Sequence, residues 1–403
     1  MSKMLIGGQG FNCLPVEIGL TIVDNTTFKI KMQVNLQNRL TLLAEIAIML
    51  MHTCAKKESM AVTIKDIARK AGVSHATVSR ALNGNTAISE STAAGIRELA
   101  DVMGYSPSAA ARGLKTNHSR VIGVIVSHID NPYFGEIVQG IEDTLQGTGY
   151  SLFFASSHMN PENEKKIVQA FAEHRVEGVI ICSVTVGSQQ ADALRQNGMP
   201  IVVINNQSPE RFNCSIAHDD LDGARQVTRH LLSLGHKRIA YLGNESAERI
   251  NKERLAGFWT ELNEAGIKAD PALILDCGGS EIENGVAGMQ KIFEIQPLPT
   301  AVFCFNDLMA IGALSVMKDA GIGVPEQMSL AGFDNIEYSK YTQPPLTTFD
   351  QPKRAIGAEA ASLLMERIQL ARNNEHPKPI TRNMRGNLLV RNSTAPIKNK
   401  EER

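Results

Sequence analysis

The sequence predicts a small all-α headpiece followed by a larger α/β core that has two lobes and parallel sheets. Two patterns carry this prediction. Apolar residues between Val62 and Gly84 recur at helical spacing on both sides of a turn, whereas short β-rich runs alternate with amphipathic stretches from Val121 onward. The alternating part covers about 270 residues, more than one compact core comfortably holds, and its continuously apolar strands indicate sheets covered on both faces.

The first headpiece helix has its apolar residues at Ile64, Ile67, Ala68 and Ala71. Thr63 precedes them and can cap the helix through its hydroxyl. Gly72 follows where a helix ends in a left-handed residue, and Val73 fills the angle before the second helix, His75 to Leu82. Ser74 can cap that second helix.

The second helix has one apolar and one polar face. Its inward residues are Val78, Ala81 and Leu82, and its outward residues are His75, Ala76, Ser79 and Arg80. This is the layout of a helix-turn-helix, whose recognition helix presents its first residues to base edges in the major groove. An ordinary helical hairpin is the alternative, but the caps, the glycine and the polar outer face together favour DNA binding.

A third helix is expected from Ile88 to Tyr105, with Ser89 as its cap and Gly104 at its end. Its expected inner face consists of Thr92, Ile96, Leu99, Ala100 and Met103. The Ala-rich piece from Pro107 to Lys115 is too short to be a stable helix alone in water, and residues 116–120 are expected to be a linker.

The core is expected to contain eight strands that alternate with helices. The strands begin at Val121, Ser151, Gly178, Pro200, Arg238, Ala272, Thr300 and Met328. Clear helical stretches are Ile137 to Gln146, Ala224 to Leu234 and Asp307 to Gly321.

Polar pairs follow four of these strands, namely Asp130-Asn131, Asn205-Asn206, Asn306-Asp307 and Asp334-Asn335. Any one pair could be a helix cap or a turn. Ligands of parallel sheets bind outside the carboxyl ends of strands, so the set predicts a polar cleft for a neutral, hydroxyl-rich small molecule. We expect Asp307 and Asp334 to hydrogen-bond that ligand.

Composition narrows the function further. The chain has 403 residues and a net charge of −1, but residues 61–119 carry seven Lys or Arg against four Asp or Glu, as a phosphate-facing module requires. No C-x-x-C pair, His/Cys cluster, P-loop or Ser-His-Asp set is evident, so no metal, cofactor or catalytic residue is expected. No apolar segment approaches the roughly 20 residues of a membrane span, and no secretory signal is evident, so a cytoplasmic protein is expected.

Six motifs, in order, are A-G-V-S-x-x-T-V-S-R, L-x-x-L-G-H-K-R-I-A, R-L-A-G-F, F-x-N-D-x-M-A-x-G-A, A-G-F-D-N and P-P-L-T-T. From about Val62 to Thr394 the chain resembles the lac repressor/galactose repressor family. The resemblance implies a homodimer that binds a palindromic double-stranded operator, a hinge helix at the operator centre, and a core like a periplasmic sugar-binding protein that holds an effector.

Carried over by position, the resemblance implies specific site residues. Those expected at DNA are Thr63, Ser74, His75, Ala76, Thr77, Ser79, Arg80, Asn83 and, in the minor groove, Leu114 and Lys115. Those expected at the effector are Tyr133, Phe134, Asn205, Arg254, Asn306, Asp334 and Gln351. Leu114 is expected to act as a wedge between base pairs.

The chain departs from the family pattern in three places. The third helix has Ala93, Ala94 and Gly95 where basic residues are frequent, Ser280 replaces an aromatic that commonly stacks on the ligand, and Asn205 replaces an acid. Tyr133 and Phe134 are therefore expected to supply the stacking. Operator affinity is expected to be modest.

We therefore expect a repressor of carbohydrate genes whose effector is a sugar or sugar phosphate. The alternatives are a purine- or nucleoside-responsive regulator of the same family and, disfavoured by the helix-turn-helix, a solute-binding protein. Expected domains are an extension at 1–60, a headpiece at 61–106, a hinge helix and linker at 107–120, a core at 121–397 and a tail at 398–403. The extension is expected to be a disordered tail or to precede a true start at Met60, and a regulatory or oligomerising extra domain is the alternative. A strand near Ile18 to Val23 and a helix near Leu40 to Met51 are indicated within it.

Overall fold

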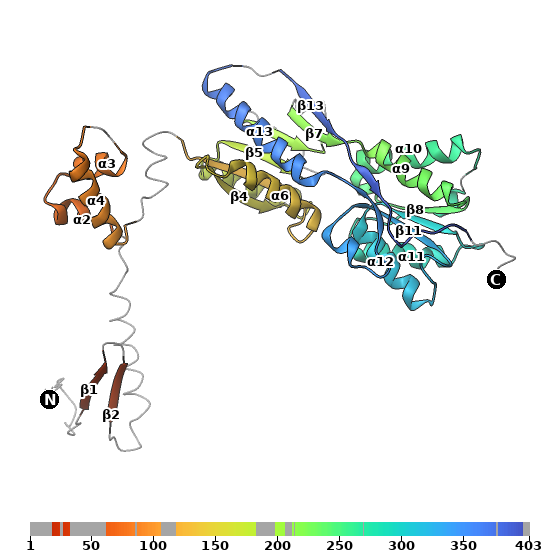
Figure 1. Cartoon of the computed structure of the whole chain (residues 1–403), viewed down its shortest axis with the longest axis horizontal. Helices are drawn as coiled ribbons and strands as arrows, with labels where there is room; N and C mark the ends of the chain where they lie inside the picture. The colour runs from red at the N-terminus through yellow and green to blue at the C-terminus, as the bar shows by residue number, and fades with distance from the viewer. Residues whose placement is uncertain are drawn as a thin grey trace. The chain divides into compact units, whose positions relative to one another are not determined.

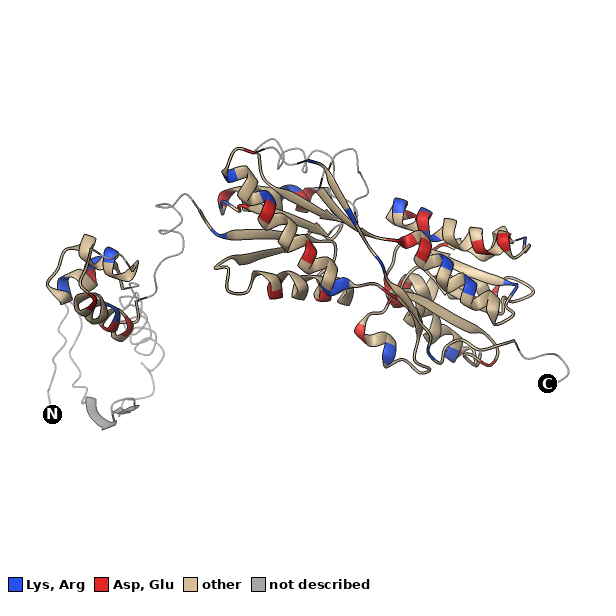
Figure 2. Ribbon diagram, turned by 45° about the horizontal axis from the view of Figure 1, so that its top comes forward, with Lys and Arg blue, Asp and Glu red and all other residues tan. Residues whose placement is uncertain are grey.

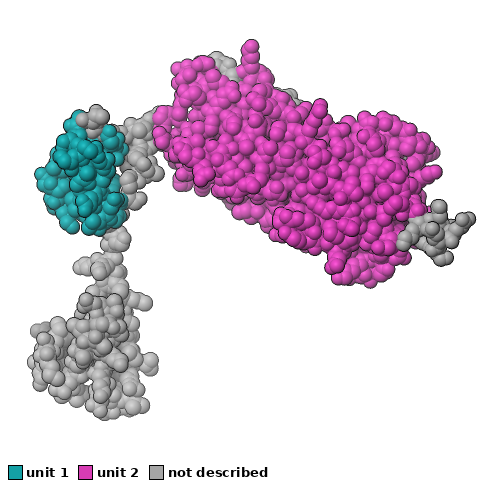
Figure 3. Space-filling model, viewed as in Figure 1, with its two compact units in different colours: residues 1–107 teal, residues 108–403 magenta. Residues whose placement is uncertain are grey.

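The computed structural model describes residues 18–24, 27–32, 62–84, 87–105, 118–182, 198–205, 212, 214–268, 270–375 and 378–397. Residues 1–107 and 108–403 form two separate compact units, coloured apart in Figure 3. None of the helices within the described ranges is long and apolar enough to cross a membrane.

The first unit begins with an antiparallel pair of strands, β1 (Ile18–Asp24) and β2 (Thr27–Met32). The strand expected near Ile18 is therefore confirmed, whereas its partner β2 was not expected from the sequence. The helix expected from Leu40 to Met51 lies outside the described residues.

Three helices form the headpiece, α2 (Ile64–Ala71), α3 (His75–Leu82) and α4 (Glu90–Val102). They pack around a small core that includes Ile67, Val78, Ala81, Ala93, Ile96 and Ala100. Gly72 ends α2 in the left-handed region at φ 68°. The Ser74 hydroxyl accepts a hydrogen bond from Thr77 N at 3.1 Å, so this predicted cap is confirmed.

Thr63 and Asp66 form a capping box at the start of α2, so the predicted N-cap at Thr63 is confirmed. The Thr63 hydroxyl also donates to Asp66 Oδ2 at 2.6 Å. The third helix differs from expectation in one detail. On α4, Thr92 is exposed and Ala93 is buried instead. The inner face of α4 thus runs through Ala93, Ile96 and Ala100, so a basic residue at position 93 would have to be buried.

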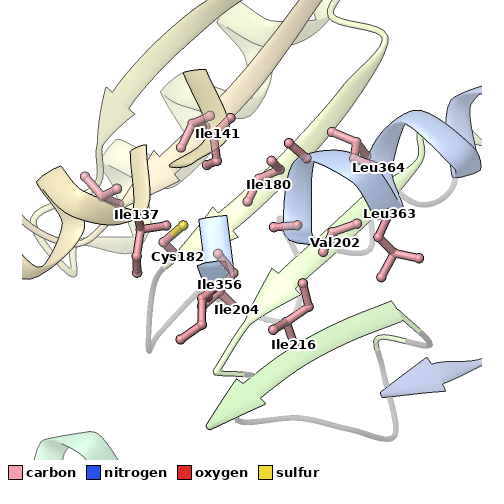
Figure 4. Close-up of a cluster of buried hydrophobic side chains, with 14 of the residues drawn as sticks. Ile137, Ile141, Ile180, Cys182, Val202, Ile204, Ile216, Ile356, Leu363 and Leu364 are labelled. Carbon is pink, nitrogen blue, oxygen red and sulfur yellow. The ribbon is translucent and has the colours of Figure 1, made fainter. Parts of the chain in front are cut away.

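The first lobe of the core is a parallel sheet of six strands in the order β13-β7-β6-β5-β3-β4. Its strands are β3 (Val121–Val126), β4 (Ser151–Ser156), β5 (Gly178–Cys182), β6 (Ile201–Ile204), β7 (Cys214–His218) and β13 (Ile380–Met384). Its described helices are α6 (Pro132–Leu145), α7 (Pro161–Glu173) and α13 (Lys353–Arg372). Figure 4 shows part of the apolar core, where α6 and α13 bury their isoleucines and leucines against the sheet.

The second lobe has a sheet in the order β14-β12-β11-β10-β8-β9, parallel except for the edge strand β14. Its strands are β8 (Ile239–Gly243), β9 (Ile274–Asp276), β10 (Ala301–Cys304), β11 (Ser329–Asp334), β12 (Thr347–Asp350) and β14 (Asn387–Leu389). Its helices are α9 (Asp220–Ser233), α10 (Glu248–Glu264), α11 (Ile282–Phe293) and α12 (Asp307–Asp319). Short 3-10 turns lie at Glu245–Ala247, Pro271–Leu273 and Glu337–Lys340.

The chain passes between the lobes three times, after β7, after β12 and after β13. The crossing segments are visible between the two lobes in Figure 1. Residues next to the first two crossings, such as His218 and Gln351, therefore lie where the lobes meet.

Within the first lobe, α6 and α13 approach closely through two glycines. A Cβ atom on Gly140 would lie 2.1 Å from Arg354 O, and one on Gly357 would lie 2.0 Å from Ile137 O. Any side chain at either position would collide with the backbone of the other helix.

Candidate functional site

The outer face of α3 is the candidate DNA surface. His75, Arg80 and Asn83 are exposed, and Ala76, Thr77 and Ser79 are partly buried. Asn83 Nδ2 donates to Ser79 O at 2.6 Å and so closes the end of the helix.

The arginines of the headpiece differ in whether they form ion pairs. Figure 2 shows Lys and Arg distributed over the headpiece together with acids. Arg69 pairs with Asp66 and Arg97 with Glu90, whereas Arg80 makes no ion pair within the described part of the chain. Leu114 and Lys115 lie outside the described residues, so their expected minor-groove role stays a prediction.

A cleft of about 750 Å³, including its opening to solvent, lies between the lobes of the core. Six of the seven expected effector residues line it, namely Tyr133, Phe134, Asn205, Arg254, Asn306 and Asp334. Gln351 does not line the cleft, but it contacts two residues that do. The expectation that Asp307 hydrogen-bonds the ligand is wrong, because Asp307 is fully buried within the second lobe. Its carboxylate accepts hydrogen bonds from Thr348 Oγ1 at 2.6 Å and Ile336 N at 2.9 Å.

The floor of the cleft is a closed ring of polar contacts that joins both lobes, hereafter the floor ring. Its members are Tyr133, Asn205, His218, Asp220, Arg254, Asp334 and Gln351. In one half, Gln351 Nε2 donates to Asp334 Oδ1 at 2.6 Å, Tyr133 OH donates to Gln351 Oε1 at 3.0 Å, and Asn205 Nδ2 donates to Tyr133 OH at 3.1 Å.

The other half of the floor ring carries the charges. His218 Nδ1 lies 2.8 Å from Asn205 Oδ1, and His218 Nε2 lies 3.0 Å from Asp220 Oδ1. Arg254 Nε donates to Asp220 Oδ1 at 2.8 Å, and its Nη2 lies 3.7 Å from Asp334 Oδ1, which closes the ring. His218 and Asp220 were missed from the sequence, because nothing in it places that segment beside Arg254.

Arg254 is held on all sides. Its guanidinium carbon lies 3.8 Å from the centre of the Phe333 ring and 4.5 Å from that of Phe305, and Nη1 donates to Phe305 O. A guanidinium stacked on aromatic faces and paired with a carboxylate is well ordered before any ligand arrives. Arg254 therefore presents a fixed cationic edge at the cleft floor.

Burial and charge set the ionisation of the carboxylates. Burial raises the pKa of Asp334 to about 6, although Arg254 and Lys353 act against the shift. Burial also opposes ionisation of Asp220, but His218 and Arg254 outweigh it and hold the pKa of Asp220 below its usual value. Burial, aided by the charge of Asp334, raises the pKa of Asp307 to about 8.

Asp334 sits on a strained turn. The φ angles of Asp334 and Asn335 are 106° and 50°, in the backbone region that residues other than glycine rarely adopt. The buried ammonium of Lys353 donates to Asp334 O at 2.6 Å and to Asn335 O at 3.0 Å. Lys353 thus anchors the start of α13 to the turn that presents the Asp334 carboxylate. A strained backbone persists only where surrounding contacts hold it, and Lys353 supplies such contacts.

The cleft walls add further polar groups. Asn306 Nδ2 donates to Ser280 O at 2.9 Å, which fixes the segment that precedes α11. His128 and Glu281 line the cleft from opposite lobes, and burial raises the pKa of Glu281. Neither residue was predicted, since each follows its strand without a motif. No cluster of three or more His, Cys, Asp or Glu suited to a metal occurs among the residues that the structure describes.

Comparison with known proteins gives two family matches. Residues 63–108 match the family described as bacterial regulatory proteins, lacI family. Residues 119–386 match the family described as periplasmic binding proteins and sugar binding domain of LacI family. Residues 1–62 are covered by neither match.

Individual proteins agree with the family matches. The chain is 35% identical to the HTH-type transcriptional repressor PurR of Aliivibrio salmonicida over 326 residues, which cover 79% of this chain and 98% of the relative. A structure of the lac repressor bound to ONPG superposes with a TM-score of 0.72 at 27% identity, over 83% of this chain and 100% of that one. The regulator CelR in complex with cellobiose gives a TM-score of 0.63 at 28% identity, over 82% and 99% of the two chains.

Proposed function

Because the chain belongs to the LacI family of bacterial regulatory proteins and is a DNA-binding transcriptional repressor, we propose that a small molecule in the interlobe cleft controls its binding to operator DNA. The floor ring carries this proposal, because it joins side chains of both lobes beneath the cleft. A ligand that contacts the ring from above gains affinity only in the lobe arrangement that fits it, and so shifts the population of arrangements.

The proposed DNA contacts are those of the α3 face, with His75 and Ala76 choosing the sequence and Arg80 contacting a base. Arg and guanine form a bidentate pair worth about 1–3 kcal/mol of discrimination. We propose a homodimer on a palindromic operator, since a two-fold protein presents two such helices to two half-sites.

A purine base or nucleoside is the first candidate effector. Relatives named PurR, between 34% and 37% identical, favour it over the sugar expected from the sequence. The rings of Tyr133 and Phe134 line the cleft with their centroids 5.3 Å apart, and either could stack on a base.

A sugar is the second candidate, because the related CelR structure contains cellobiose. In addition, Ser280 in the cleft lining offers no ring on which a purine base could stack. A phosphorylated ligand is disfavoured. Arg254 is the only Lys or Arg among the described residues of the lining, and it is already paired with Asp220. Asp334 and Glu281 add negative charge that would repel a phosphate.

The test is a thermal-shift screen of the full chain with purine bases, nucleosides, monosaccharides and disaccharides. A cleft ligand stabilises the folded state by mass action, so a true effector raises the melting temperature with concentration. The same ligand must change operator affinity. If a ligand stabilises the protein but leaves operator affinity unchanged, control by the cleft is refuted.

A further inference from the structure

The linker enters the core through a compact cluster of hydrogen bonds, hereafter the exit cluster, formed by Arg120, Tyr150, Glu177 and Arg372. Arg120 N donates to Glu177 Oε1 at 2.7 Å, and Tyr150 OH donates to Glu177 Oε2 at 3.1 Å. Arg372 Nη2 donates to the same Oε2 and lies 2.8 Å from Tyr150 OH. One carboxylate thus joins the linker, the start of β4 and the end of α13.

Glu177 is well suited to hold this point. Its side chain is only 11% exposed. Burial alone would raise the pKa of the Glu177 carboxyl, but the hydrogen bonds from Arg120, Arg372 and Tyr150 outweigh burial and lower the pKa. Charge-assisted hydrogen bonds of this kind are stronger than neutral ones.

The backbone at the exit cluster is strained. Arg120 has a φ of 54°, in the left-handed region that favours glycine. It is held there on both sides, because Arg120 O accepts from Ser151 N at 2.9 Å and Arg120 N donates to Glu177. A strained residue persists only where its surroundings fix it, and this one lies between the linker and the first strand of the core.

Helix α13 connects the exit cluster to the cleft. Lys353 at its first position bonds to the turn that carries Asp334, and Arg372 at its last position bonds to Glu177. The helix has 20 residues and spans about 30 Å. Its close contact with α6 at Gly140 and Gly357 leaves it little freedom to shift independently of the first lobe.

We propose that Glu177 is a positioning residue for operator binding: it fixes the path by which the linker leaves the core and, through Arg372 and α13, ties that path to the turn at Asp334. A hinge segment that leaves the core in one fixed direction loses less conformational freedom when it docks on DNA than a freely pivoting one. This proposal rests on the proposed function, because it requires sequence-specific DNA binding.

The experiment compares Glu177→Gln and Arg372→Gln with the wild-type full chain on an operator obtained by selection from random DNA. Each variant is expected to weaken operator affinity roughly 2- to 30-fold, while affinity for unrelated DNA stays constant because the headpiece is unchanged. The double variant is expected to be no weaker than the worse single variant, since both remove the same contact.

The matched control is Asp143→Asn. Asp143 on α6 accepts from Arg354 on α13 at 2.8 Å, but both side chains are more than half exposed and neither contacts the linker. Asp143→Asn is expected to leave operator affinity unchanged.

The outcomes separate the two proposals. A wild-type chain that selects no sequence refutes the proposed function itself. Sequence-specific binding by the wild type, with equal operator affinity in Glu177→Gln and Arg372→Gln, overturns the positioning role alone. Unfolding of either variant in a thermal melt would show that the exit cluster serves folding, which also contradicts the proposal.

Discussion

Tyr133 and Gln351 lie 218 positions apart in the sequence, yet the Tyr133 hydroxyl donates to Gln351 Oε1 at 3.0 Å beneath the cleft. Tyr133 belongs to α6 of the first lobe, and Gln351 lies at the second crossing between the lobes. Gln351 also donates to Asp334 at the end of β11, so a single carboxamide joins the two lobes.

Replacement of Gln351 by Leu should therefore loosen the lobes without unfolding them. The change removes the acceptor of the buried Tyr133 hydroxyl and the amide donor to Asp334 Oδ1, which costs about 1–3 kcal/mol. We expect a loss of roughly 5- to 150-fold in affinity for the cleft ligand, measured by calorimetry. Gln369→Leu on the exposed side of α13 is the control and should bind like the wild type. Equal affinities for both variants would remove Gln351 from the site.

Replacement of Arg254 should lower the unfolding free energy far more than replacement of a surface arginine. Arg254→Met removes the guanidinium partner of the buried carboxylates of Asp220 and Asp334, a loss of about 3–5 kcal/mol in unfolding free energy. Arg354→Met removes an exposed pair and should cost about 0–1 kcal/mol. Urea unfolding of the two variants measures the difference. Adding Asp220→Asn to Arg254→Met should restore part of the loss, and no restoration would argue against the pairing.

Asp307 predicts a pH dependence of stability. Its pKa is about 8 in the folded protein and about 3.9 in an unfolded chain, so between these values the folded state binds the extra proton. The contribution of Asp307 to the unfolding free energy is therefore complete below pH 4 and is lost as the pH rises to 8. Asp307→Asn should remove this dependence.

The contribution of Asp307 is isolated by comparing the unfolding free energy of the wild type with that of Asp307→Asn at each pH. Burial lowers the pKa of His230 and His236, which makes stability rise with pH near neutrality, but this contribution is common to wild type and variant. Urea unfolding at pH 5, 6, 7 and 8 should show the variant gaining on the wild type at each step. A constant difference would show that Asp307 is ionised throughout.

Much of the fold follows from local sequence, and the exceptions have physical reasons. All eight expected strands are present, because each is a run of mainly apolar residues, and most of the strands are buried on both faces. β7, β12, β13 and β14 were missed, since their short segments carry polar residues such as His218, Thr347 and Arg382 and are ordered by their neighbours in the sheet.

The site was predicted less completely than the fold. Motifs located Arg254 and Asp334, but His218 and Asp220 join them only through the first crossing between lobes, which no local pattern records. Asp307 was misplaced because a carboxylate after a strand can point into the lobe as well as into the cleft.

Two glycines in helices should respond in opposite directions to replacement by alanine. Gly95 in α4 has nothing within 4 Å of its missing Cβ, so Gly95→Ala should stabilise the headpiece by about 1 kcal/mol. Gly357→Ala places a methyl group 2.0 Å from Ile137 O and should destabilise the core by about 1–3 kcal/mol or more. Thermal melts of the two variants test this. A stabilising Gly357→Ala would mean that α6 and α13 are farther apart.

The most direct test of control through the cleft is the operator affinity of the full chain with and without the ligand that stabilises it in the thermal screen. Linkage requires that the ligand change operator affinity, and that operator change ligand affinity, by the same factor, expected to be about 5- to 150-fold. Fluorescence anisotropy with labelled operator gives the first factor, and calorimetry on the operator complex gives the second. Equal factors within that range are the predicted result, whereas an operator affinity that does not depend on the ligand would contradict it.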